Sequence, residues 1–121
     1  MNREDVIEDG KTFQLADLSK ARAESERPYL EFLRVPSLSM GLYALPTGGV
    51  DPQKPHTEDE VYYVVSGRAF ITVGAEDYSV EPGSVVYVKA GVEHRFHDMV
   101  EDLAVLVFFA PAEYTGGVGK E

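Results

Sequence analysis

Histidine is scarce in this 121-residue sequence, which contains only His56, His94 and His97. His56 lies four residues before Glu60, and His94 follows a tight turn some three β-prone runs further on. Two imidazoles and a carboxylate converging from adjacent strands would form a facial triad, the ligand set associated with non-haem iron(II) and open to zinc, manganese or nickel. The spacing alone equally allows structural histidines beside a solvated acidic turn.

The amino-acid composition limits the metal ligands and the partners that this protein can have. The chain has no cysteine, so any metal must be bound by histidine, carboxylate, amide or water ligands. Eleven basic and 21 acidic residues give a formal charge of −10, which would repel nucleic acid and anionic membrane surfaces. The start of the chain lacks the apolar stretch of a signal peptide, and the apolar run from Leu103 is too short to span a bilayer. We therefore expect a cytoplasmic protein without nucleic-acid or membrane partners.

Short β-prone runs separated by turn residues follow Pro28, which ends a predicted helix at Leu15–Glu26. Their regular spacing indicates an all-β barrel or sandwich. Several runs are apolar at both parities, as when a second subunit covers a barrel, so we expect a homodimer. We predict an N-terminal segment (residues 1–28), a barrel (29–111) and a flexible tail (112–121). The predicted strands are Tyr29–Val35, Leu38–Leu45, Val61–Ser66, Ala69–Val73, Tyr78–Val80, Ser84–Val88, Glu93–His97 and Leu103–Ala110.

The alternation of side chains along a strand indicates which way several further residues face. Tyr62 shares a face with Glu60 and would place a phenol, a possible proton donor, near the metal. His97 is predicted to face away from the site, and Glu58 and Asp59 to face solvent. The candidates for lining the cavity are Tyr62, Val64, Phe70, Phe96 and Phe108. The candidates for binding a substrate carboxylate are Arg34, Arg68 and Arg95.

Two motifs in this sequence resemble those of the cupin superfamily, G-x5-H-x-H-x3-E-x6-G and G-x5-P-x-G-x2-H-x3-N. The seven matching positions are Gly48, His56, Glu60, Gly67, Gly83, Gly91 and His94. The short segment between the motifs is typical of small single-domain bacterial cupins. The resemblance implies a single jelly-roll β-barrel, with His56, Glu60 and His94 as metal ligands.

The three departures from the motifs are all polar residues. Lys54 occupies the position of the first motif histidine, and a protonated ammonium cannot bind a metal. Gln53 beside it is a minor candidate for a fourth ligand. Lys89 replaces the motif proline and Asp98 the motif asparagine, and both changes are interpreted as structural.

The resemblance implies a protein that uses one divalent ion (iron, manganese, nickel or zinc) to activate a small organic substrate. Cupins with comparable ligand sets include dioxygenases, isomerases and lyases. Lys54 would neutralise a substrate carboxylate or enolate at the pocket rim, so Lys54 and Tyr62 are the predicted catalytic residues. Two alternatives stay open: a non-catalytic cupin that binds a metal or small molecule, and a metal-free, epimerase-type cupin with a histidine as general base.

Overall fold

The computed structural model describes residues 9–114, which form one helix and eight strands. The strand predictions are confirmed, with ends that differ by at most two residues. The elements are α1 (Leu15–Ser25), β1 (Tyr29–Val35), β2 (Leu38–Leu45), β3 (Asp59–Ser66), β4 (Ala69–Val73), β5 (Glu76–Val80), β6 (Val85–Val88), β7 (His94–His97) and β8 (Leu103–Ala110).

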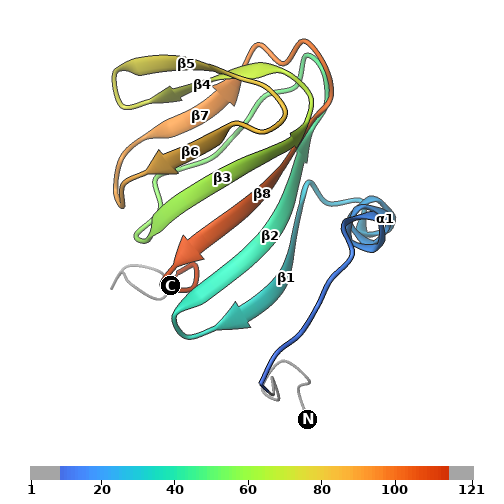
Figure 1. Ribbon diagram of the computed structural model, residues 1–121. Coiled ribbons are helices and arrows are strands. Elements are labelled where there is room, and N and C mark those ends of the chain that lie inside the picture. The colour runs from blue at the N-terminus through green and yellow to red at the C-terminus, as the bar shows by residue number, and fades with distance from the viewer. Residues whose placement is uncertain (1–8, 115–121) are drawn as a thin grey trace.

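The strands form two antiparallel sheets that curve around a common core (Figure 1). The larger sheet has the order β1-β2-β8-β3-β6, and the smaller sheet has the order β5-β4-β7. Strands β3 and β8 are far apart in the sequence but pair along their length, from Asp59 opposite Ala110 to Ser66 opposite Ala104. This arrangement confirms the predicted all-β jelly-roll fold.

The core lies between the sheets and is filled by alternate residues of each strand. In β8 the buried residues are Leu103, Val105, Val107 and Phe109. Phe108, which we expected to line the cavity, lies on the other face. Phe70 is also misassigned, since it is 42% exposed and stacks against His97. Both faces of these strands are apolar, so alternation alone did not show which one is inside.

Helix α1 lies outside the larger sheet beside β1 and β2, and none of its residues is buried (Figure 1). It ends at Ser25, because Glu26 adopts a left-handed conformation with φ 62° and Pro28 follows. Phe13, ahead of the helix, packs edge-on against Phe32 of β1. The helix is neither long nor apolar enough to cross a membrane.

Strand β3 begins at Asp59, two residues before the predicted Val61. Glu60 is therefore an inward-facing strand residue. Glu58 is only 2% exposed, which corrects the prediction that it faces solvent, whereas Asp59 is exposed and accepts a hydrogen bond from the Ala90 backbone. At the same end of the sheet, where Asp59 pairs with Ala110, Ala112 and Glu113 are buried although both fall in the predicted flexible tail. Residues 115–121 of that tail lie outside the described part of the chain.

Gly67 and Gly83 both have positive φ angles, 91° and 96°, but their surroundings differ. A Cβ atom on Gly67 would lie 2.2 Å from the carbonyl oxygen of Asp102 and 2.7 Å from the Cα of Leu103. A Cβ atom on Gly83 would meet nothing within 4 Å. The turn after β3 therefore needs glycine for close packing against the start of β8, whereas Gly83 meets only a conformational requirement.

We predict that Gly83→Ala lowers the free energy of unfolding by roughly 1–2 kcal/mol, the cost of a left-handed backbone with a side chain. Gly67→Ala carries the same cost and in addition about 1–3 kcal/mol for the clash with β8. Urea unfolding of both variants measures the difference. Equal losses in the two variants would show that the close approach at Gly67 has no energetic weight.

Candidate metal centre

Three residues from separate parts of the chain meet between the two sheets. Glu60 is the second residue of β3, and His94 is the first residue of β7 in the other sheet. His56 precedes β3 in a loop, where its carbonyl oxygen accepts a hydrogen bond of 2.7 Å from Gly91 N–H. This bond ties the loop to the turn that leads into β7. The structure thus brings together the three predicted metal ligands.

The potential ligand atoms of the triad face one another. Nε2 of His94 lies 3.0 Å from Oε1 of Glu60, and Nδ1 of His56 lies 3.5 Å from the same oxygen. One ligand atom from each residue lies within 4.8 Å of the other two. All three side chains are buried, and Glu60 is only 1% exposed. This geometry allows one ion to contact all three residues.

The hydrogen bonding of these groups also fits a cation. Within residues 9–114, His56 Nδ1, both carboxylate oxygens of Glu60 and His94 Nε2 are buried without a hydrogen-bond partner. The other nitrogen of each ring has a partner: His94 Nδ1 donates to the Val92 carbonyl at 2.9 Å, and His56 Nε2 lies 3.1 Å from Oε2 of Glu113. Buried polar atoms are rarely left unsatisfied. A divalent ion would satisfy all four, so the residues present fit such a group.

The charge states of the triad depend on its mutual contacts. Burial disfavours ionisation of Glu60, but the neighbouring His56 and His94 outweigh burial and lower the pKa of the carboxyl. Burial likewise disfavours protonation of His56, but the carboxylates of Glu113 and Glu60 raise its pKa to about 9 in the metal-free protein. Glu60 is therefore ionised and would serve as an anionic ligand, and a metal ion would have to displace a proton from His56.

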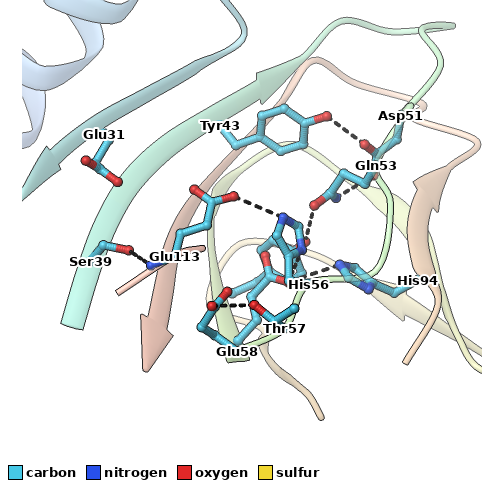
Figure 2. A network of polar contacts seen from close by, with 12 residues as sticks. Glu31, Ser39, Tyr43, Asp51, Gln53, His56, Thr57, Glu58, His94 and Glu113 are labelled. Atoms are coloured by element: carbon cyan, nitrogen blue, oxygen red, sulfur yellow. Dashed lines mark hydrogen bonds and ion pairs between the residues drawn. The ribbon is translucent and has the colours of Figure 1, made fainter. Parts of the chain in front are cut away.

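The remaining predicted site residues lie around the triad. Tyr62 is fully buried, and its hydroxyl donates to Oε1 of Gln53 at 2.9 Å. The Gln53 amide in turn donates to Asp51, so both ends of this side chain are engaged close to the triad (Figure 2). Lys54 is exposed and lines the cavity described below. Its ammonium takes no part in the triad.

Other candidates are separated from the site or already paired. His97 contacts Thr72, Asp77 and Asp98 away from the triad, as predicted. Arg34 forms two hydrogen bonds to Glu31, and Arg68 pairs with Glu81 at 2.6 Å. Neither arginine therefore offers a free guanidinium to a substrate carboxylate.

A cavity of about 470 Å³ opens beside the triad. It combines apolar walls from β8 and the loop before β3 with phenol, ammonium and carboxylate groups. Its lining residues are Tyr29, Tyr43, Pro52, Gln53, Lys54, Pro55, His56, Glu60, Val107, Phe109, Glu113 and Tyr114. The volume lies in the range of small-molecule sites.

Tyr29 has a special position in this cavity. Its hydroxyl is buried and, among the described residues, has no hydrogen-bond partner. A Cβ atom on Gly41 would lie 2.2 Å from Cζ of the Tyr29 ring, so only glycine allows the ring to lie there. Burial, reinforced by Glu113, raises the pKa of Tyr29, which keeps the phenol neutral and able to donate.

Sequence reasoning missed Tyr29, Asp51 and Glu113. Asp51 is buried and accepts hydrogen bonds from the Tyr43 hydroxyl (2.6 Å) and the Phe96 backbone (2.8 Å), which ties the loop before β3 to both sheets. None of the three belongs to a motif position. Only Tyr29 had a signal in the sequence, since it is the first residue of the first predicted strand. The alternation of that strand did not show that the Tyr29 side chain points into the cavity.

The sequence and the fold were compared with those of known proteins. The sequence model of the family described as "Cupin domain" matches residues 41–109, more than half of the chain. The protein therefore belongs to the cupin family. The matched segment contains all three triad residues.

Three individual proteins match most of this chain. The chain is 58% identical over 103 residues to the uncharacterized protein SCO3923 of Streptomyces coelicolor, a match that covers 85% of this chain and 98% of that protein. The protein TT1209 from Thermus thermophilus is 26% identical with a TM-score of 0.66, over 84% of this chain and 97% of that one. A chain from the crystal structures of the DMSP lyases RdDddP and RnDddQII is 26% identical with a TM-score of 0.62, over 73% of this chain and 47% of that one.

Proposed function

We propose that this protein is an enzyme that holds one divalent metal ion with His56, Glu60 and His94 and acts on a small organic substrate in the adjoining cavity. The observation that carries the proposal is the set of four buried atoms that these residues turn toward one another and that have no hydrogen-bond partner among the described residues. When bound, the ion supplies Lewis acidity toward a carbonyl or enolate oxygen of the substrate. Iron, manganese, nickel and zinc all suit this ligand set.

The chain itself supplies the groups that would position the substrate. The Tyr29 hydroxyl, neutral and without a partner, would donate a hydrogen bond to a substrate oxygen. Lys54, exposed on the cavity wall, would neutralise a carboxylate or enolate. The apolar side chains of Val107 and Phe109 would contact the carbon skeleton. These groups favour a small organic acid or an enolisable carbonyl compound.

Proton-transfer chemistry, in an isomerase or a lyase, is the reaction type that this cavity favours. The Tyr29 hydroxyl, which has no hydrogen-bond partner among the described residues, would donate a hydrogen bond to the enolate oxygen that develops in such a reaction, whereas the Tyr43 and Tyr62 hydroxyls already donate to Asp51 and Gln53. The 26% identity to a chain from the DMSP lyase structures supports lyase chemistry. Dioxygenase chemistry is the second candidate, because a three-residue ligand set leaves open positions for oxygen and substrate. Oxygen uptake during turnover distinguishes the two.

We expect the protein, purified without a histidine tag, to bind one divalent ion per chain. His94→Ala removes a ligand, so its metal affinity should fall by more than the roughly 10–100-fold typical of losing an outer partner. Mass spectrometry of metal content and competition with a chelator measure both values. His97→Ala is the matched control, because this histidine lies outside the triad, and it should retain the ion. Equal loss in both variants, or a wild-type chain that gains no metal, would contradict the proposal.

The substrate contacts have a kinetic test once a screen of 2-oxo acids and enolisable carbonyl compounds yields turnover. Lys54→Ala should raise KM about fivefold with little change in kcat, as expected for losing an exposed charge contact worth about 1 kcal/mol. Tyr29→Phe should lower kcat/KM about tenfold. Lys89→Ala removes an exposed lysine elsewhere and should match the wild type. Unchanged KM in Lys54→Ala would remove this residue from the site.

A non-catalytic role is the alternative from another functional class. The same triad and cavity would then bind a metal or ligand without turnover. The metal-free, epimerase-type alternative is less favoured, because it leaves the buried triad with only the contacts that its members make to one another, at 3.0 and 3.5 Å. A protein with stoichiometric metal that consumes no compound of the screen would point to the binding role. The cytoplasmic location expected from the sequence also stays a proposal.

We also propose a homodimer, formed through the outer face of the larger sheet. Strand β6 lies at the edge of this sheet and exposes Val85 and Tyr87, and Tyr63 lies opposite Val85 on β3. An unpaired apolar edge next to exposed aromatic residues suits pairing with a second copy across a two-fold axis. Light scattering should give twice the mass of one chain, and Val85→Lys should give a monomer. Val100→Lys, at an exposed loop valine, should stay dimeric; a monomeric wild-type protein would contradict the proposal.

A further inference from the structure

The two histidines of the triad turn opposite nitrogens toward Glu60. His94 faces the carboxylate with Nε2, and its Nδ1–H is held by the Val92 carbonyl at 2.9 Å. His56 faces it with Nδ1, and its Nε2 lies 3.1 Å from Oε2 of Glu113 (Figure 2). Glu113 therefore contacts the ring nitrogen of His56 that faces away from Glu60, just as the Val92 carbonyl contacts the corresponding nitrogen of His94.

Glu113 is itself held from several directions. Its N–H donates to Oγ of Ser39 at 2.9 Å, and its carbonyl oxygen accepts from Nη2 of Arg34 at 3.0 Å. The preceding Ala112 donates to the Pro36 carbonyl in the turn between β1 and β2. The backbone at Glu113 is thus bound to the first hairpin, which fixes the point from which its carboxylate reaches His56.

We propose that Glu113 is a positioning residue that orients His56 for the metal by accepting a hydrogen bond from its Nε2–H. This inference rests on the metal site of the proposed function. A neutral imidazole has one N–H and one lone pair, and a carboxylate can only accept. With the proton held at Nε2, the lone pair is at Nδ1 and points toward Glu60 and the ion. Such carboxylate–histidine–metal arrangements set both ring orientation and ligand basicity.

The contact between Glu113 and His56 is more important because Lys54 replaces the first motif histidine. With a lysine in the first-histidine position, the protein has three metal ligands, and His56 is the only one on a loop. The strands fix the backbone of Glu60 and His94. The Gly91 bond fixes the His56 backbone, and Glu113 fixes its ring.

The ring nitrogens can be assigned directly in the zinc-loaded protein. Long-range proton–nitrogen NMR spectra should show zinc bound at Nδ1 of His56 with a proton on Nε2, and zinc bound at Nε2 of His94 with a proton on Nδ1. Opposite coordination in the two rings is the expected result. Zinc bound through Nε2 of His56 would overturn the proposal.

Metal affinity provides the second test. Glu113→Ala should weaken zinc binding by about 10–100-fold, the usual effect of losing an outer partner. Glu113→Gln keeps an oxygen that accepts the Nε2–H bond and should recover most of that loss. Glu101→Ala removes the same charge at an exposed position and should bind zinc as the wild type does. Circular dichroism and urea unfolding establish that each variant is folded.

The outcomes separate this inference from the proposed function. Wild-type affinity in Glu113→Ala overturns the role of Glu113 but leaves the metal site intact. A wild-type chain that binds no zinc contradicts both. Cobalt absorption spectra decide a remaining case: a lower coordination number in Glu113→Gln would make Glu113 a ligand of the ion and overturn its outer role.

Discussion

The structure is organised around the carboxylate of Glu60, which is buried between two imidazoles and has, within residues 9–114, no hydrogen-bond partner for either oxygen. Burying an ionised group costs several kcal/mol unless opposite charge and polar partners compensate. The jelly-roll brings β3 of one sheet and β7 of the other to the same place, which sets the His94 imidazole 3.0 Å from the Glu60 carboxylate. A cation between these three side chains would therefore supply the missing partner.

A second set of polar contacts keeps the loop before β3 in place. Tyr62 donates to Gln53, Gln53 donates to Asp51, and Asp51 accepts from Tyr43 and from the Phe96 backbone. This series of hydrogen bonds connects β2, β3 and β7 through buried and partly buried side chains, where an unmade hydrogen bond is costly. Gln53, considered as a fourth ligand, is committed to this network. His56 is therefore well placed although it belongs to a loop.

The lysine at the first-histidine position changes the site without removing it. Its side chain is exposed on the cavity wall, so its charge does not oppose an ion inside the barrel. Glu113 approaches the triad from the C-terminal segment and carries negative charge to the side of His56 away from Glu60. The described residues thus combine the triad with a carboxylate beside His56 and a lysine on the cavity wall.

The sequence by itself determined the strands, the barrel and the triad, because each depends on local patterns: alternating apolar residues, turn glycines and ligand types at motif spacing. It did not determine which face of β8 is inside, since Phe108 and Phe109 are equally apolar. It also offered no indication that Asp51 and Glu113 support the site, and parity did not show that Tyr29 lines the cavity. These residues reach His56 and its cavity only through pairings between distant segments, such as Glu113 with Ser39. Long-range contacts of this kind have no local signature, so only the tertiary structure decided them.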